Sequence, residues 1–563
     1  MIILGVNGWY DRGHDASACI IKDGVLIAAV EEERFSRQKH SYDTMPHSSV
    51  AWCLNYCGIN VDNIDVVAVG WDIPLLYAEH KRELPFRNKE GYLDILLPRE
   101  YFGIRHRNIP VCFVNHHRAH AANSFYLSGF DESLVLVIDG QGEDSATTIW
   151  RCTKGELNKI ISFPVLLSLG YFFEAVSSFI GFSTTHAGKT MGLAAYGEAP
   201  DRELFVLNDD GYDIKKAINL TSDGSELDEQ SQLFKYWGER LTEIFGEPNR
   251  SFYRFSRRQG IFYPDVKITS REQSVAALAQ RELERVVLHL VKTYTKQYNL
   301  KNLCLAGGVA LNCSCNGKIL LSGLVDNLFI QPAPHDTGVA IGAALEVANQ
   351  YNDLNCQRMV RADLGPTYDD GEIISILKEM GIRFSVEKDI ADTAAHLISS
   401  GKIIGWFQGK CEIGPRALGN RSIIANPHTV ETRDRVNIIK GRESWRPLSP
   451  SVLAEKSSWL LGQDIDMPFM LLGLPVAIEK RHEVAGVVHI DGTARPQTVT
   501  KDLGRYYQMI TAFESITGIP LVLNTSFNGP GEPIVCTPSH AVHCFFEHPL
   551  DALVLGNCII RRE

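Results

Sequence analysis

Short apolar runs separated by glycine-containing loops open the chain. Runs at residues 2–6, 16–21 and 25–31 predict three strands, and the Asp23-Gly24 pair between the last two predicts a tight hairpin turn. The same order recurs about 130 residues later, with runs at 134–138, 146–151 and 157–163, a polar loop at 139–142 and a Lys154-Gly155 turn. Two copies of one strand pattern predict two similar lobes.

Helices are predicted between and after these lobes. Apolar positions from Val275 to Tyr294 repeat with the 3.6-residue period of a helix, and Ser270 stands where its N-cap is expected. Further helices are predicted over 115–125 and 339–351. Paired hairpin lobes around a nucleotide cleft are the plan of the actin, Hsp70 and sugar-kinase folds, so by analogy of fold we expect a duplicated, actin-like N-terminal domain.

A domain boundary is predicted after the last of these helices. Residues 351–365 are polar, and Gly365-Pro366 followed by Asp369-Asp370-Gly371 interrupts regular structure. A chain of 563 residues is also too long for one hydrophobic core. We therefore expect two domains of α/β and α+β class, at residues 1–350 and 366–563, with a linker at 351–365.

Composition narrows the class of partner. The hydrophobic content of 45% is ordinary, and the net charge of −11 is spread along the chain without a basic block. We therefore expect no nucleic acid and no membrane as partner, whereas a neutral or cationic small molecule is compatible. The 13 cysteines contain no CxxC pair, which predicts free thiols in a reducing cytoplasm. No long uncharged apolar stretch occurs, so we expect a soluble protein.

Two histidines four residues apart indicate a metal site. His116 and His120 share one face of the helix predicted at 115–125, and Asp139 and Asp336 can approach them from strand ends. Two imidazoles and two carboxylates suit iron(II), manganese(II) or zinc(II) and leave positions open for substrate. Surface histidines on a helix and a strand-capping aspartate explain the same spacing equally well.

A glycine turn follows the short strand predicted at 303–305. Gly307 and Gly308 would let a flat or charged ligand group approach the backbone, with Asn312 available for a polar contact. A turn of this kind is purely structural about as often. Its position shortly before Asp336 favours the functional interpretation.

The second predicted domain combines cations with glycines and small polar side chains. The motifs are FQGKCEIGPRALGNRSIIANP with Lys410, Arg416 and Arg421, NIIKGRESWRPLSPS with Lys440, Arg442 and Arg446, NTSFNGPGEPI with Asn524, Ser526 and Asn528, and DGTARPQTV with Arg495. Arginine forks and exposed backbone amides bind phosphate oxygens, so these motifs predict a phosphate site. The alternative is a solvated cationic face. No GxxxxGK[ST] run occurs, which excludes a P-loop.

Specific motifs occur in a fixed order along nearly the whole chain. They are NGWYDRGHDASACI, EEERFSRQKH, HHRAHAA, VIDGQGE, GKTMGLAAYG, GGVALN, HDTGVAIGAAL, GPRALGNRSI, WRPLSPS and NTSFN. With these motifs the chain resembles the O-carbamoyltransferases of antibiotic and nodulation-factor biosynthesis, most closely those of the tobramycin carbamoyltransferase type.

The resemblance implies a two-step activity. Its N-terminal domain would be like the metal-containing threonylcarbamoyl-transfer proteins of tRNA modification, and its C-terminal domain like the enzymes that make threonylcarbamoyl adenylate. The C-terminal domain would convert ATP, with Mg, and carbamoyl phosphate to carbamoyl adenylate. The N-terminal domain would then transfer the carbamoyl group to a hydroxyl of a small molecule, and AMP would leave. An aminoglycoside, macrolide, ansamycin, cephem or nodulation factor fits as acceptor.

The resemblance also implies roles for individual residues. The iron ligands fall on His116, His120, Asp139 and Asp336. The adenylate-binding positions in the first domain fall on Lys39, Gly140, Ser168, Leu169, Gly307, Gly308 and Asn312. The ATP and carbamoyl phosphate contacts fall on Arg416, Lys440, Arg446, Arg495, Asn524 and Ser526. His14 and Asp11 lie in the first glycine loop, where the acceptor would approach, although this loop reads YDRG and so departs locally from its relatives.

Carbamoyl transfer to an alcohol needs a base and a stabilised leaving group. We expect Lys39 and the glycine amides to stabilise the developing negative charge. We expect His14, a residue type whose unperturbed pKa lies near neutrality, or Asp15 beside it, to accept the hydroxyl proton. Because carbamoyl adenylate reacts with water, we also expect an enclosed path between the two active sites.

Other functions fit the sequence less well. A zinc metalloprotease would need Glu where residue 117 is His. A tRNA threonylcarbamoyl transferase is disfavoured by the acidic net charge and by the fusion of both domains in one chain. Hydrogenase-maturation carbamoyltransferases carry zinc-finger cysteine pairs that this chain lacks. An actin-like ATP-binding scaffold would have no use for the arginine motifs.

Overall fold

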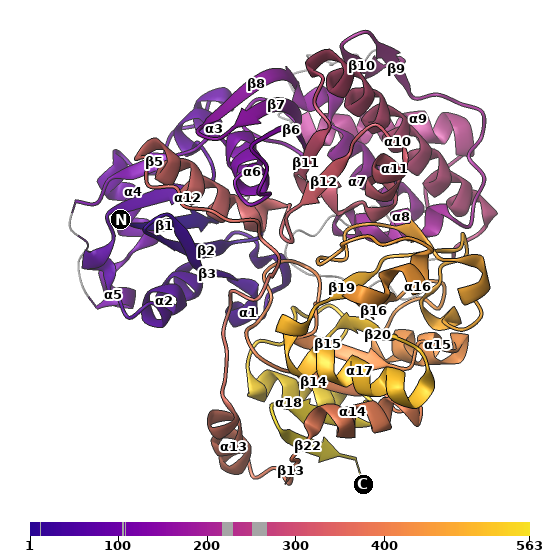
Figure 1. The fold of residues 1–563 in the computed structure, drawn as a ribbon. Coiled ribbons are helices and arrows are strands. Elements are labelled where there is room, and N and C mark those ends of the chain that lie inside the picture. Colours follow the sequence, from indigo (N-terminus) through magenta and orange to yellow (C-terminus); the bar gives the residue numbers. More distant parts are fainter. Residues whose placement is uncertain (12, 104–105, 107, 217–228, 250–266, 563) are drawn as a thin grey trace. The chain divides into compact units, whose positions relative to one another are not determined.

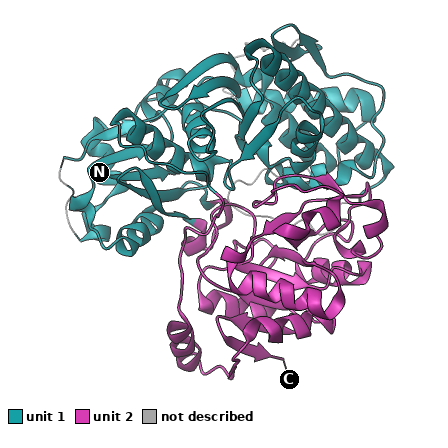
Figure 2. Cartoon of the chain, viewed as in Figure 1, with its two compact units in different colours: residues 1–32, 41–359 teal, residues 33–40, 360–563 magenta. Residues whose placement is uncertain are grey.

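A computed structural model describes the chain except for residues 12, 104–105, 107, 217–228, 250–266 and 563. It consists of two compact units (Figure 2). Unit 1 comprises residues 1–32 and 41–359, and unit 2 comprises residues 33–40 and 360–563. The last of the three crossings between the units, between residues 359 and 360, falls within 351–365. Residues 33–40 form a separate contribution to unit 2 from early in the chain.

Unit 1 contains two five-stranded sheets with the same topology. The first has the order β3-β2-β1-β4-β5 and the second the order β12-β11-β6-β7-β8 (Figure 1). In each, three antiparallel strands are extended by two parallel ones. The strands are β1 (Ile2–Asn7), β2 (Ser17–Lys22), β3 (Val25–Glu31), β4 (Val66–Val69), β5 (Val111–Phe113), β6 (Glu132–Ile138), β7 (Thr147–Thr153), β8 (Glu156–Phe163), β11 (Asn302–Ala306) and β12 (Asn327–Ile330). The predicted duplicated, actin-like domain is confirmed.

Two helices of unit 1, α6 (His116–Phe125) and α12 (Val339–Gln350), pack closely against each other and against the sheets (Figure 1). Glycines permit this approach. A Cβ atom on Gly342 would lie 1.8 Å from the Ala119 carbonyl oxygen, and one on Gly5 would lie 2.2 Å from the Ala340 carbonyl oxygen. The elements that carry the candidate metal ligands are therefore tightly packed.

The remaining elements of unit 1 cover the sheets. They are α2 (His47–Tyr56), α3 (Ile73–Glu79), α4 (Lys89–Leu96), α5 (Arg99–Phe102), α7 (Leu169–Ile180), α8 (Ala187–Ala194), the hairpin of β9 (Phe205–Asn208) and β10 (Gly211–Ile214), α9 (Glu229–Phe245), α10 (Ser270–Tyr298) and α11 (Cys313–Leu321). The prediction of Ser270 as N-cap of α10 is wrong. The cap is Thr269, which forms a capping box with Glu272.

Unit 2 is built on one eight-stranded sheet with the order β13-β22-β21-β14-β15-β20-β16-β19. Its strands are β13 (Ser385–Val386), β14 (Ile404–Phe407), β15 (Arg421–Ala425), β16 (Ser449–Leu453), β19 (Gln497–Val499), β20 (Leu521–Ser526), β21 (Ala552–Leu555) and β22 (Cys558–Arg561). A two-stranded ribbon pairs β17 (Leu474–Pro475) with β18 (Thr493–Ala494). Its helices are α13 (Asp370–Glu379), α14 (Ile390–Ser399), α15 (Val430–Ile439), α16 (Ser457–Leu461), α17 (Arg505–Thr517) and α18 (Pro538–Glu547).

Residues 33–40 are fixed within unit 2 by two arginines. They include the short helix α1 (Glu33–Ser36) and the start of a 3-10 turn at Lys39–Ser41. The Arg34 side chain is 1% exposed and donates to the Gly414 carbonyl at 2.9 Å. Arg37 donates to the carbonyls of Pro533, at 2.8 Å, and Ile534, at 2.7 Å. Hydrogen bonds from these two guanidinium groups to backbone carbonyls anchor the segment.

Two further expectations concern the cysteines and the membrane. All 13 cysteines are free thiols, as predicted. Among the residues that the structure describes, no helix combines the length and the apolar character needed to cross a bilayer.

Candidate metal centre and cationic cluster

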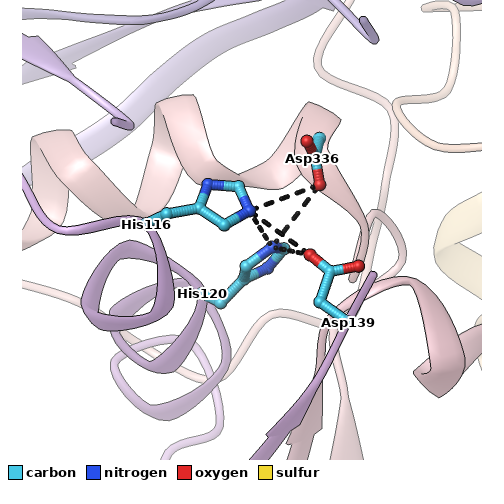
Figure 3. A group of neighbouring side chains, drawn as sticks. All are labelled: His116, His120, Asp139 and Asp336. Carbon is cyan, nitrogen blue, oxygen red and sulfur yellow. Dashed lines mark hydrogen bonds and ion pairs between the residues drawn. The ribbon is translucent and has the colours of Figure 1, made fainter. Parts of the chain in front are cut away.

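Four side chains converge in unit 1 (Figure 3). His116 and His120 project from α6, Asp139 directly follows β6, and Asp336 lies just before α12. The Nε2 atoms of His116 and His120 are 3.1 Å apart. Asp139 Oδ2 lies 3.3 Å from His116 Nε2 and 3.0 Å from His120 Nε2. Asp336 Oδ1 completes the group at 3.5 and 3.6 Å from the same two nitrogens. All four residues are buried, and their ligand atoms lie within 4.8 Å of one another.

Neighbouring backbone groups orient these ligands. The Gly70 carbonyl lies 3.1 Å from His116 Nδ1, so that nitrogen carries the proton in the neutral ring and Nε2 is left with its lone pair. Asp139 Oδ1 accepts hydrogen bonds from the amides of Gly140, at 2.9 Å, and Gly308, at 3.0 Å. Asp139 Oδ2 therefore remains directed at the imidazoles.

Glu143 is a supporting residue that the sequence did not reveal. It is 2% exposed and accepts from the His116 amide at 2.9 Å, from Asn115 Nδ2 at 2.6 Å and from the Asp72 amide at 2.8 Å. Glu143 thus holds the first turn of α6, the helix that carries His116 and His120. Burial raises the pKa of this carboxyl group, with His116 and the backbone amides opposing the shift. Its only sequence signal is its place in the motif VIDGQGE.

The charges of the group favour a bound cation. Burial lowers the pKa of His116, but the carboxylates of Asp336 and Asp139 outweigh it and raise that pKa to about 10. Burial raises the pKa of Asp139, and the carboxylate of Asp336 does so further, yet contacts with His116 and His120 leave it below its usual range. Two imidazole nitrogens and two carboxylates form a donor set that can hold a divalent metal ion.

His14 lies beside this group, and Asp11 has other partners. His14 Nε2 is 3.7 Å from Asp336 Oδ2, and His14 Nδ1 is 3.0 Å from Asp15 Oδ2. Burial opposes the charged ring, but Asp336 and Asp15 raise the pKa of His14 to about 10. Asp11 instead accepts a hydrogen bond from Tyr77 at 2.9 Å and pairs with Arg82 at 2.6 Å.

The predicted adenylate-binding residues of unit 1 surround the Asp139 loop. Gly307 has a φ of +85°, and a Cβ atom there would lie 2.2 Å from the Ile138 carbonyl oxygen, so only glycine fits. Ser168 Oγ donates to the Gly140 carbonyl at 2.7 Å and caps α7, while Leu169 is fully buried. The side chain of Asn312, which is predicted to contact the adenylate, caps α11 and exchanges hydrogen bonds with Gln280.

Unit 2 contains a cluster of cations, which we call the cationic cluster. Burial and the charges of Arg446, Arg495 and Arg416 hold the pKa of Arg442 well below its usual value. Arg495 donates to Ser449 Oγ at 2.9 Å, and Arg442 approaches Thr525 Oγ1 at 3.4 Å. Mutually repelling guanidinium groups in a desolvated setting are typical of a site for a multiply charged anion.

Lys39 belongs to the same cluster. Although the sequence resemblance assigned it to the first domain, it lies in the 33–40 segment of unit 2. Loss of hydration lowers the pKa of the Lys39 ammonium group, and the positive charges of Arg442, Arg446 and Arg34 lower it further. The carboxylate of Glu33 has the opposite effect but is outweighed.

Other predicted residues of unit 2 have structural partners. Lys440 Nζ binds the carbonyls of Ser526, at 2.7 Å, and Asn528, at 2.6 Å, and so fixes the end of β20. Asn524 Nδ2 donates to the Ala417 carbonyl at 3.1 Å. The expectation that Arg421 joins the phosphate site is wrong, because its buried guanidinium lies 3.6 Å above the Phe407 ring and donates to backbone carbonyls.

Two family profiles match the chain. The carbamoyltransferase N-terminus covers residues 2–345, and the carbamoyltransferase C-terminus covers residues 395–562. The chain is 37% identical over 573 residues to nodulation protein NolNO of Sinorhizobium fredii, covering 98% of this chain and 79% of that protein. It is 30% identical to 3'-hydroxymethylcephem-O-carbamoyltransferase of Amycolatopsis lactamdurans, over 98% of each. The chain belongs to the carbamoyltransferase family, which confirms the predicted resemblance and makes it a transferase enzyme.

One solved structure with a related fold is a more distant match. Full-length HypF in its phosphate- and nucleotide-bound form aligns over 62% of this chain and 46% of its own, with 16% identity and a TM-score of 0.37. A similarity this low supports no conclusion about activity.

Proposed function

We propose that this protein is an ATP-dependent O-carbamoyltransferase that works in two half-reactions. In the first, ATP, carbamoyl phosphate and water yield carbamoyl adenylate, pyrophosphate and phosphate. In the second, a hydroxyl oxygen bonds to the carbamoyl carbon, the bond from that carbon to the adenylate oxygen breaks, and AMP leaves with the hydroxyl proton. The observation that supports the proposal is that one chain of this family has clustered positive side chains in unit 2 and a buried His/Asp group that can hold a metal ion in unit 1.

The cationic cluster of unit 2 suits the first half-reaction. ATP and carbamoyl phosphate are both polyanions, and their reaction brings phosphate groups together that repel one another. Arg416, Arg442, Arg446, Arg495 and Lys39 can offset this repulsion and hold the two substrates in position. Asn524 and Ser526 at the end of β20 add neutral polar groups, with Lys440 keeping that strand end in place.

The buried group of unit 1 suits the second half-reaction. His116, His120, Asp139 and Asp336 would hold iron(II), manganese(II) or zinc(II), which would supply Lewis-acid chemistry for carbamoyl transfer. Asp336 and Asp15 favour the protonated ring of His14, which cannot accept a proton. His14 can therefore accept a proton only when a positive charge offsets the Asp336 carboxylate. The amides of Gly140 and Gly308 keep Asp139 in its ligand orientation throughout.

The acceptor in this proposal is a hydroxyl of a small-molecule natural product. The name of the Amycolatopsis relative specifies O-carbamoylation of a hydroxymethylcephem, which is a small molecule of this kind. The acidic net charge of −11 is compatible with an amino sugar as well.

Separate assays test the two half-reactions. Pyrophosphate release from ATP should require carbamoyl phosphate and should proceed without acceptor. Mass spectrometry of a panel of aminoglycosides, cephems, macrolides and nodulation factors should then show one carbamoylated product that forms only with both substrates. Pyrophosphate release that ignores carbamoyl phosphate would contradict the proposal, and matched reactions with acetyl phosphate serve as the control.

A further inference from the structure

A cavity of about 350 Å³ lies within unit 2. It is lined by residues 360–363, the turn at 412–420, the loop at 466–469, strand β19 and residues 500–503, all of them in unit 2. Its volume falls in the range of roughly 300–1,000 Å³ that is common for small-molecule sites. Apolar side chains such as Leu418 and Phe469 share the wall with polar ones.

The charged side chains of this wall are mostly acidic. Among the described lining residues, Asp363, Glu412, Asp466 and Asp502 face a single cation, Arg361, so the formal charge is −3 (one positive and four negative groups). Arg361 is already engaged, since it pairs with Asp363 at 2.6 Å and with Asp502 at 3.3 Å. The cavity therefore favours a positively charged occupant.

Glu412 supplies a buried acceptor without a donor. The residue is 2% exposed, and its Oε1 accepts from the backbone amides of Leu418 and Asn420, both at 2.8 Å, and of Arg421, at 3.1 Å. Its Oε2 is also buried but has no hydrogen-bond partner within the part of the chain that the structure describes. A buried carboxylate oxygen without a hydrogen-bond donor keeps the full penalty of its lost hydration. A ligand that donates a hydrogen bond at this point would remove that penalty.

The cavity is separate from the cationic cluster. Arg416 lies in the same turn as Glu412, and Arg495 lies two residues before Gln497 of the wall, yet neither arginine lines the cavity. The same two stretches of chain thus place positive groups at one site and acidic or neutral groups at the other. The phosphate-bearing substrates of the proposed function would be repelled from this cavity, so its ligand is a different molecule.

The separation of the acids distinguishes an organic cation from a metal ion. Among the described residues, the convergent group of His, Cys, Asp or Glu ligand atoms is that of unit 1. The four acids of the cavity do not meet at one point. Separate carboxylates on a wall that also carries apolar side chains match ammonium groups joined by a hydrocarbon chain.

We propose that this cavity binds a small organic cation with ammonium groups, one of which donates a hydrogen bond to Glu412 Oε2. The site is distinct from both half-reactions and does not depend on the proposed function. Its binding is measured without ATP or carbamoyl phosphate, so failure here leaves the carbamoyl-transfer proposal untouched.

Isothermal titration of the full-length protein with putrescine tests the proposal. Butanediol and succinate are its neutral and anionic counterparts of similar length. Putrescine should bind at least about tenfold more tightly than butanediol, because a charge-assisted hydrogen bond contributes about 1.5–3 kcal/mol. Succinate should not bind. Equal binding of putrescine and butanediol would overturn the proposal, as would binding of Mg²⁺ without binding of putrescine.

Variants locate the site. Glu412→Gln keeps an oxygen for the three backbone amides but removes the charge, so it should weaken putrescine binding by about tenfold or more with an unchanged melting temperature. Asp466→Asn removes a second cavity charge without altering the Glu412 turn, and it should also weaken binding if Glu412→Gln does not fold. The control Glu479→Gln removes an exposed charge outside the cavity and should bind like the natural protein. Equal affinities in all these proteins would refute the assignment.

Discussion

The candidate metal centre of unit 1 and the cationic cluster of unit 2 are built from opposite chemistry. Unit 1 brings together four electron-pair donors, two of them carboxylates, at distances of 3.0–3.6 Å. Unit 2 brings together guanidinium and ammonium groups whose mutual repulsion lowers the pKa of Arg442. A bound cation would offset the two carboxylates of unit 1, and a bound anion would offset the positive charges of unit 2. The contrast indicates that the two proposed half-reactions use sites of opposite charge, one in each unit.

The two sites also differ in how they are supported. In unit 1, hydrogen bonds with backbone groups of Gly70, Gly140 and Gly308 fix the orientation of His116 and Asp139. In unit 2, Arg495 is held through the hydroxyl of Ser449, and Arg442 makes only a long contact of 3.4 Å with Thr525. We infer that the metal centre is preorganised, whereas the phosphate groups of the substrates complete the order of the cationic cluster.

The strongest test of this comparison is His120→Ala. Loss of one imidazole should lower carbamoyl transfer by at least about a thousandfold, because a Lewis acid contributes several kcal/mol and each 1.36 kcal/mol is a factor of ten. Pyrophosphate release in unit 2 should stay within about twofold. Metal analysis and the two half-reaction assays measure this, with exposed His482→Ala as control. Transfer at the natural rate in the His120 variant would disprove a role for the metal centre.

Arg442→Ala should produce the reverse pattern. Loss of charge-assisted hydrogen bonds to phosphate, at about 1.5–3 kcal/mol, should lower pyrophosphate release by about tenfold to a hundredfold. Metal content and transfer from added carbamoyl adenylate should not change. Arg435→Ala, which removes an exposed arginine paired with Asp551, is the matched control. If added adenylate is not used by the Arg442 variant, the two sites are not separable.

Lys39→Ala sharpens the comparison, because the sequence and the fold assign this residue to different domains. Its place in the cationic cluster predicts that pyrophosphate release falls by about tenfold while transfer from added carbamoyl adenylate persists. Lys22→Ala, an exposed lysine at the end of β2, is the control. The opposite result, with transfer lost and pyrophosphate release retained, would assign Lys39 to the metal centre.

Glu143→Gln should give a smaller effect that is confined to unit 1. The new amide would place a donor against Asn115 Nδ2 or the His116 amide, both of which already donate to this carboxylate. Metal affinity should fall by about tenfold, at the low end of the range for outer-shell partners of a metal site. Competition with a chromogenic chelator measures this, and Glu132→Gln at the start of β6 is the control. An unchanged affinity would mean that α6 needs no such support.

Much of the fold of unit 1 could be predicted from the sequence. Alternating apolar runs and glycine turns locate β1, β2, β3, β6, β7 and β8 to within one or two residues, because the period of the pattern and the turn chemistry agree. The spacing of His116 and His120 likewise follows from the helix period. These are local signals, and the structure preserves them.

Long-range relations could not be predicted in this way. Nothing near Lys39 indicates that its segment belongs to unit 2, since eight residues carry no usable periodicity. Arg421 and Arg416 look alike in their motif, but only the tertiary fold places the Arg421 guanidinium over Phe407. The hydrogen-bond partner of Asn312 is Gln280 on α10, which is 32 residues away in the sequence, so the local motif does not reveal this contact.

The 33–40 segment has a consequence for the order in which the protein is made. It leaves the ribosome about 320 residues before the rest of unit 2 begins (360 − 40). At roughly 5–20 residues per second, Arg34 and Arg37 wait roughly 15–60 s for the carbonyl groups to which they donate. A fragment that starts at residue 360 would never receive them. Unit 2 is therefore compact in space but cannot be obtained complete by a single cut in the gene, and any attempt to study it alone must supply the early segment separately.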